Sequence, residues 1–127
     1  LIVSANFSKY VNVKDYKELI ESFLIVQGAA KRIKVDTESQ MYITAVYRKL
    51  GICVQFGNVS RFYADFIKLQ HLYNIGIINE GLIITLSKEV HEHFKLSNCT
   101  SYERVSKEMH IFKSFINAPI MVMGVKK

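Results

Sequence analysis

The sequence predicts an α/β fold, a three-layer α-β-α domain in which helices cover both faces of a mixed central sheet. The main observation is that segments with helical spacing of apolar residues alternate with short segments rich in β-branched and aromatic residues. A second observation is the apolar run Leu82–Leu86, which is typical of a strand covered on both faces. Two strand-like segments joined only by Arg48 and Lys49 add an antiparallel pair, so the sheet is predicted to be mixed.

The beginning of the chain predicts a helix and then an exposed strand. From Asn12 to Val26, apolar residues recur at helical spacing, and acidic residues occupy the first turns, where they complement the helix dipole. Gly28 is expected to end this helix. Over Lys31–Val35, charged and apolar residues alternate, as in a strand with one face in water. The polar stretch 36–39 then predicts a turn.

A hairpin and a long helix are predicted next. Met41–Tyr47 and Leu50–Phe56 are rich in strand-forming residues, and the two-residue link between them favours an antiparallel hairpin. Ser60–Tyr73 predicts an amphipathic helix, because apolar residues recur along it at spacings of four, three and four. This apolar stripe consists of Phe62, Phe66, Leu69 and Tyr73.

The last part of the chain predicts two helices and two buried strands. Leu82–Leu86 is expected to be the first strand, and Ser87 is expected to cap a helix over Lys88–Phe94. A further helix is predicted over Tyr102–Met109. Ile120–Val125 is expected to be the last buried strand.

Several side chains of this region have a predicted location. We interpret His91 and His93 as surface residues, because they flank Glu92 in a polar helix and a spacing of two does not place them on one helical face. Aromatic and aliphatic residues after the last helix are interpreted as core rather than as a surface for stacking bases. These are Phe112, Phe115 and Ile116.

Length and composition predict one domain spanning residues 1–127. Half of the residues are hydrophobic, which is enough to build a core and argues against disorder. No apolar run approaches the length of a membrane span, so we expect no membrane partner. The two cysteines, Cys53 and Cys99, lack the spacing of a metal site, and we expect an intracellular, reducing compartment.

The net charge of +6, with a pI near 9.3, predicts a polyanionic partner, most often nucleic acid. Arg61 and Lys68 are seven residues apart and share one face of their predicted helix, while Asn58 lies near its N-terminus, where free N–H groups suit phosphate. A second basic cluster contains Lys31 and Arg32. If these residues converge, they can hold a phosphate backbone; the alternative is a solvated positive surface.

The middle of the chain resembles a known family of nucleases. The resemblance is carried by Val54–Asn58 (Val-Gln-Phe-Gly-Asn), Arg61–Asp65 and Lys68-Leu69, and it continues through Leu72–Ile78 and Gly81–Thr85. More weakly, it extends to residues 102–103 and 118–122, so that it covers roughly residues 12 to 125. In these segments the chain is similar to BglII/BstYI-type restriction endonucleases, which belong to the PD-(D/E)XK nuclease class.

The resemblance implies a restriction-endonuclease-like fold and Mg²⁺-dependent cleavage of duplex DNA. The family site consists of an Asp on the first hairpin strand, a Glu nine residues later and a Gln two residues after the Glu, and the acids hold Mg²⁺. Gln55 matches this Gln, but Cys53 stands at the Glu position and Thr44 at the Asp position. A thiol is a poor Mg²⁺ ligand and a neutral hydroxyl adds no charge, so the mapping implies a degenerate site without a metal or other cofactor.

Gln55 and Cys53 also have simpler interpretations. Gln55 is either an inherited site position or a polar residue that satisfies buried backbone groups at the end of a strand. Cys53 is interpreted as a buried, inert thiol, because no residue near it in the sequence supports a nucleophile.

Three functional hypotheses follow. The first is a degenerate nuclease domain that binds nucleic acid, DNA rather than RNA, without cutting it. The second is an active Mg²⁺-dependent endonuclease with relocated acids, although roles in helix turns, in a chain turn or in an ion pair explain these acids more simply. The third is a structural subunit of a larger ribonucleoprotein assembly. Because family members usually act as dimers, the resemblance also implies a homodimer or a larger assembly. The acids of the second hypothesis are Glu18, Glu21, Asp36, Glu38 and Asp65.

Overall fold

The computed structural model describes residues 2–4, 12–96 and 100–126 of the chain, in which strands and helices alternate. The strands are β1 (Ile2–Ser4), β2 (Ala30–Lys34), β3 (Tyr42–Tyr47), β4 (Leu50–Val54), β5 (Glu80–Leu86) and β6 (Ile120–Lys126). The helices are α1 (Val13–Val26), α2 (Val59–Asn74), α3 (Lys88–His93), α4 (Tyr102–Glu108) and the 3₁₀ helix η1 (Met109–Ser114). Within these residues, no helix is both long and apolar enough to cross a membrane.

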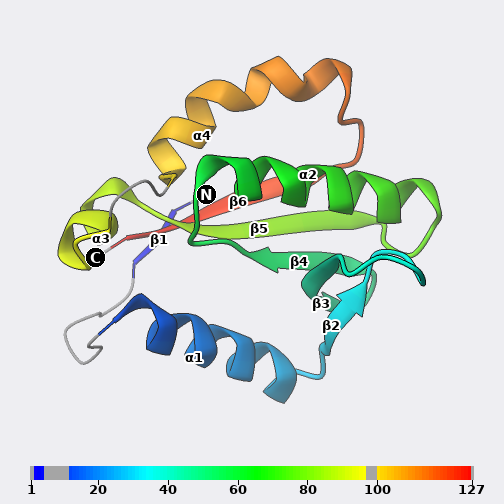
Figure 1. Cartoon of the computed structure of the whole chain (residues 1–127), viewed down its shortest axis with the longest axis horizontal. Helices are drawn as coiled ribbons and strands as arrows, with labels where there is room; N and C mark the ends of the chain where they lie inside the picture. Colours follow the sequence, from blue (N-terminus) through cyan, green and yellow to red (C-terminus); the bar gives the residue numbers. More distant parts are fainter. Residues whose placement is uncertain (1, 5–11, 97–99, 127) are drawn as a thin grey trace.

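The strands of the described residues form one mixed, six-stranded sheet. Its order is β1-β6-β5-β4-β3-β2; neighbours from β1 to β4 along this order are parallel, and β3 and β2 continue it antiparallel. Figure 1 shows α1 on one side of the sheet and α2 and α4 on the other, so that the sheet is the middle of three layers. The predicted α/β class, with a mixed sheet covered on both faces, is therefore confirmed.

Two apolar clusters, one on each face of the sheet, hold the layers together. On the α1 face, Tyr16 of α1 packs with Ile52 and Val54 of β4. On the α2 face, Phe62 and Leu69 of α2 are completely buried. Burial of an aliphatic or Phe side chain of this size contributes about 1.5–3 kcal/mol, so these clusters fix the position of the helices on the sheet.

Helix α2 carries the predicted apolar stripe with one change at its end. Phe62, Phe66 and Leu69 are buried as predicted. At the last turn, Leu72 is buried in place of Tyr73, which is only partly buried. The buried face of α2 therefore shifts slightly around the helix axis toward its C-terminus. A stripe predicted from fixed spacing does not show this shift.

Strands β3 and β4 form the predicted hairpin. Tyr47 pairs with Leu50, and the two turn residues, Arg48 and Lys49, have φ angles of 47° and 65°. Left-handed backbone at both positions is the geometry of a type I′ turn, which matches the twist of the strands. The last residue of β4 is Val54, two residues before its predicted end, where the chain turns toward α2.

Strands β2 and β3 are kinked at the same point. Alternate residues of a regular strand share one face, yet Ala45 belongs to the α1-face cluster and Ile43 to the α2-face cluster. Thr44 lies where β3 changes face, and Arg32, at the matching point of β2, has a φ angle of 56°. Here the Thr44 hydroxyl accepts a hydrogen bond from the Val54 N–H at 2.9 Å, so a side chain replaces part of the β3–β4 ladder.

The structure corrects two predictions for α3. His91, predicted to be at the surface, is only 7% exposed, because the backbone at Thr100 lies against its imidazole. His93 is partly exposed. Ser87 occupies the N-cap position, but its hydroxyl makes no capping hydrogen bond. Neither difference is visible in local spacing, because each involves a residue that follows α3: Thr100 lies beside His91, and Glu103 Oε2 accepts the Lys88 N–H at 2.8 Å. Cys99 lies outside the described residues.

Two further segments differ from the prediction. The short strand β1 has no pattern of its own and was not predicted; parallel pairing with β6 holds it in the sheet. Phe115, predicted to be core, is 71% exposed, because η1 ends before it and the chain there leaves the aromatic cluster formed by Phe62, Tyr63 and Phe66 of α2. Phe112 does contact that cluster, with its ring centre 4.7 Å from that of Tyr63, and Ile116 packs against the α2-face cluster.

Candidate functional site

A cavity of about 370 Å³ opens at the kink of β2 and β3. Its walls come from α1, from the strands β2, β3 and β4, and from α2. It is lined by Lys17, Glu21, Lys31, Arg32, Tyr42, Ile43, Thr44, Cys53, Val54, Gln55, Asp65 and Lys68. The fold thus brings together six of the eight residues that the sequence analysis singled out for a site.

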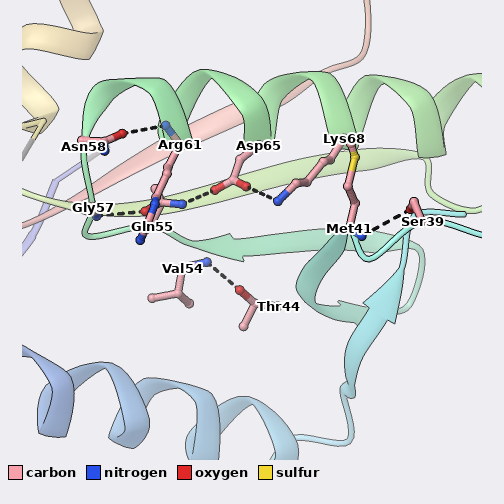
Figure 2. Close-up of polar contacts among 10 residues, drawn as sticks. All are labelled: Ser39, Met41, Thr44, Val54, Gln55, Gly57, Asn58, Arg61, Asp65 and Lys68. Atoms are coloured by element: carbon pink, nitrogen blue, oxygen red, sulfur yellow. Dashed lines mark hydrogen bonds and ion pairs between the residues drawn. The ribbon is translucent and has the colours of Figure 1, made fainter.

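A hydrogen-bonded chain of Gln55, Asp65 and Lys68 forms one wall of the cavity (Figure 2). Gln55 Nε2 donates to Asp65 Oδ2 at 2.9 Å, and Lys68 Nζ lies 3.3 Å from Asp65 Oδ1. Gln55 Oε1 accepts a hydrogen bond from the Gly57 N–H at 2.9 Å. Asp65 is 4% exposed, so these donors take the place of water around its carboxylate. Gln55 therefore joins the end of β4 to α2 and satisfies a backbone group of the turn.

Thr44 and Cys53 supply no anionic group to the cavity. The Thr44 hydroxyl already accepts the Val54 N–H. Cys53 is 2% exposed, and burial, reinforced by the nearby Asp65 carboxylate, raises the pKa of its thiol. The thiol is therefore protonated at neutral pH, and it is neither a thiolate nucleophile nor a ligand for a hard cation.

Positive charge predominates in the lining of the cavity. Among the described residues, four cationic and two carboxylate side chains line it, so its formal charge is +2. Two of the cations are paired: Lys68 with Asp65, and Lys31, whose Nζ lies 3.8 Å from Glu21 Oε2. The excess of positive charge therefore resides on the other two cations.

Those two cations are Lys17 and Arg32, which have no carboxylate within 4.0 Å in the part of the chain that the structure describes. The charge of Lys17 acts on the buried thiol of Cys53. The Arg32 guanidinium lies 4.6 Å from the centre of the Tyr42 ring, a cation–π contact. Lys17 was not predicted to be a site residue. It stands four residues before Glu21 on α1, but this spacing indicates a shared cavity only once α1 is known to face the hairpin.

Asn58 and Arg61 lie beside the cavity and do not line it. Asn58 Oδ1 accepts the Arg61 N–H at 3.0 Å, so the Asn58 side chain serves as the N-cap of α2. The Arg61 side chain passes along the turn at Gly57, where its Cδ would stand 3.2 Å from an added Cβ. Of the two cations that share a face of α2, only Lys68 reaches the cavity.

The acids considered as substitutes for the family's acids lie in several places. Glu21 and Asp65 line the cavity. Glu18 is exposed and pairs with a lysine of its own helix. Asp36 lines a separate groove between the β2–β3 connection and α2, and Glu38 lines neither. The fold therefore brings two of these five carboxylates to the cavity that Thr44 and Cys53 also line.

The donors of the cavity do not fit Mg²⁺, the metal that the resemblance implies. A hard cation takes oxygen ligands with free lone pairs, but Asp65 is engaged by Gln55 and Lys68, and Glu21 faces Lys31. The four cations of the lining also repel a divalent cation. Over residues 2–4, 12–96 and 100–126, no three His, Cys, Asp or Glu side chains are grouped to hold a metal. The donor set is suited to an anion.

Comparison with known proteins identifies a family and a similar solved structure. Residues 5–125 match the family described as restriction endonuclease BglII/BglIII. The structure is also similar to the crystal structure of restriction endonuclease BglII complexed with a DNA 16-mer, with a TM-score of 0.78 and 15% sequence identity. The match covers 100% of this chain and 64% of that chain. At this identity the likeness establishes the fold; no curated protein matches the sequence.

Proposed function

The chain belongs to the family of restriction endonucleases BglII and BglIII, and from this premise we propose that it binds duplex DNA without cutting it. The observation that carries the proposal is the charge of the cavity at the β3–β4 hairpin. At the two positions that the resemblance assigns to catalytic acids, this chain has Thr44 and Cys53, and the surrounding side chains give a formal charge of +2.

The absence of cleavage follows from the chemistry of the donors. Hydrolysis by this family depends on carboxylates that hold a hard cation. In this cavity the Thr44 hydroxyl accepts a backbone hydrogen bond, the Cys53 thiol is buried and protonated, and the Asp65 carboxylate is held by its neighbours. We therefore assign no hydrolytic step to the cavity.

The binding of DNA follows from charge and shape together. Lysine and arginine side chains contact the phosphate backbone in most protein–DNA complexes, and the chain carries a net charge of +6. The similar fold of BglII was solved as a complex with a DNA 16-mer, which supports DNA over RNA as the partner. A homodimer, which would place two cavities along one duplex, remains part of this proposal.

The proposal can be tested with a labelled 16-base-pair duplex and a supercoiled plasmid. We expect the affinity measured by fluorescence anisotropy to fall steeply with NaCl, and to be the same in EDTA and in Mg²⁺ at equal ionic strength. We expect no nicking of the plasmid. Robust Mg²⁺-dependent nicking would overturn the proposal, and a chain that ignores both DNA and RNA at low salt would favour a purely structural role.

An active endonuclease is the second candidate, and one observation favours it: the carboxylates of Glu21 and Asp65 both line the cavity. If these acids supplied the metal ligands, the plasmid would be nicked in Mg²⁺. Nicking would then be lost in Glu21→Gln and in Asp65→Asn, whereas Glu18→Gln, which alters an exposed acid of the same helix, would leave it unchanged.

A further inference from the structure

We propose that Lys17 and Arg32 contact the DNA phosphate in this cavity, whereas Lys68 is a positioning residue and Glu21 weakens binding. The inference rests on the proposed function, since its ligand is a phosphate of the DNA backbone. It goes further by giving the cations of the cavity different roles: the sequence predicts a DNA contact for Lys68 and none for Lys17, whereas the pairing of Lys68 with Asp65 favours the reverse.

Lys68 is already committed to Asp65. Its Nζ lies 3.3 Å from the carboxylate, and the two side chains are 22% and 6% exposed. A phosphate that took Lys68 would leave a buried carboxylate with Gln55 as its remaining donor, and a buried charge that loses a partner is strongly unfavourable. Lys68 therefore holds Asp65, and through it the wall formed by Gln55, in place.

Lys31 is held less firmly. Its Nζ lies 3.8 Å from Glu21, and both side chains reach solvent, so the pair is weak. The Glu21 carboxylate nevertheless stands in the same cavity and repels an incoming phosphate. Removing its charge frees Lys31 and removes this repulsion, so both effects act in the direction of tighter binding.

Lys17 and Arg32 are free to meet an anion. Neither has a carboxylate within 4.0 Å among the described residues, and both line the cavity, Lys17 from α1 and Arg32 from β2. The backbone of Arg32 supports this role, because a φ of 56° is unusual inside a strand and occurs where the surrounding structure imposes a particular orientation. The Tyr42 ring beneath the guanidinium limits its freedom further.

The test compares the salt dependence of duplex binding in six variants of the full chain, with the labelled 16-base-pair duplex as the probe. We expect Lys17→Gln and Arg32→Gln each to lower affinity about tenfold at low salt and to reduce the salt slope by about one. Arg32→Lys, which keeps the charge, should have the salt slope of the natural chain. We expect Glu21→Gln to bind more tightly than the natural chain, in the absence of any metal. Lys113→Gln, an exposed cation of η1 outside the cavity, is the matched control.

Lys68→Met completes the comparison. It should lower the temperature of thermal unfolding and leave the salt slope unchanged, because the lysine acts through Asp65. The inference is overturned if Lys68→Met lowers the slope while Lys17→Gln and Arg32→Gln do not, or if Glu21→Gln weakens binding. A natural chain that does not bind the duplex refutes the proposed function itself. If all variants bind the duplex with the same salt slope as the natural chain, only the role of this cavity is refuted.

Discussion

Individual side chains determine which sign of charge the cavity accepts. Thr44 and Cys53 are neutral, and both are constrained: the hydroxyl accepts a backbone N–H, and the thiol is buried against α2. Asp65 is charged, but Gln55 and Lys68 hold it in an internal network. The remaining charge comes from cations. Replacing only Thr44 and Cys53 by acids should therefore change the preference of the cavity from anions to cations.

Restoring both acids tests this statement. The double variant Thr44→Asp, Cys53→Glu should gain affinity for Mg²⁺, because carboxylates at the two positions supply the oxygen ligands that the natural chain lacks. Burying a glutamate should lower stability without metal, and saturating Mg²⁺ should raise Tm by several degrees. Isothermal titration and thermal melts with and without Mg²⁺ would measure both effects.

The control for this variant is Thr44→Asn with Cys53→Gln, which has nearly the same shape and no added charge. It should show neither Mg²⁺ binding nor a metal-dependent Tm. If the natural chain bound Mg²⁺ as tightly as the double variant, the interpretation of Thr44 and Cys53 as degenerate positions would be wrong.

His91 should make stability sensitive to mild acid. Burial lowers the pKa of its imidazole below 6.5, although the Thr100 backbone and the Glu103 carboxylate act in the opposite direction. Because the unfolded state then binds the proton more readily, the free energy of unfolding should decrease as the pH falls below about 6.5. Urea unfolding at about pH 7.5 and about pH 5.5 would show the loss, and His91→Gln should reduce it.

The comparison for His91 is His110, which is exposed. His110→Gln, which removes an exposed histidine, is the matched control. An unchanged pH dependence in His91→Gln would show that another group titrates on unfolding.

Elements with a strong local signal form where the sequence predicts them. Helix α1 begins after Asn12, which caps it, and the type I′ turn of the hairpin falls on the two predicted residues. Helix α3 has only six residues, and its cap position is occupied by Ser87, whose buried hydroxyl has no hydrogen-bond partner among the described residues. A polar residue at the N-cap therefore stabilises a helix only where its side chain makes the capping hydrogen bond, as Asn12 does and Ser87 does not.

A pair of cap variants measures this difference. Asn58→Ala should lower the free energy of unfolding by about 1 kcal/mol, because the Arg61 N–H loses its acceptor. Ser87→Ala should cause no loss, since its hydroxyl makes no bond and is 2% exposed. Chemical denaturation of both variants is the measurement. An equal loss in the two would indicate that the Ser87 hydroxyl has a partner in solution.

Part of the candidate site follows from the sequence, and part does not. The β3–β4 hairpin is a local structure, so the proximity of Thr44 and Cys53 could be predicted from a strand pattern and a two-residue turn. The place of Lys17 in the cavity could not be predicted, because no local pattern shows which polar residues of an amphipathic helix border a cavity. The carboxylate of Asp65 was predicted to pair with a helix neighbour, as it does with Lys68, but its contact with Gln55 depends on the packing of α2 on β4.

At the scale of the whole molecule, the sheet brings the cavity together from segments far apart in the sequence. Residues of α1, the β2–β3 pair, the end of β4 and the middle of α2 meet only because the strand order places β4 beside β3 and both helices over this region. The class of fold could be predicted, since alternating helical and strand patterns leave few arrangements. The kink at Arg32 and Thr44 could not, because it depends on how both faces of the sheet are packed.

The pairing of β1 with β6 has a consequence for the order of folding. Ile2 stands beside Gly124, so this edge of the sheet joins segments from opposite ends of the described chain, whereas the hairpin closes through a two-residue turn. Contacts between distant segments form late, since the cost of closing the intervening loop precedes their gain. On the ribosome, β1 emerges before the other described strands and waits longest for its partner. Among the described strands, the one synthesised first is thus the last to be incorporated, and until then β6 presents an open edge to other nascent chains.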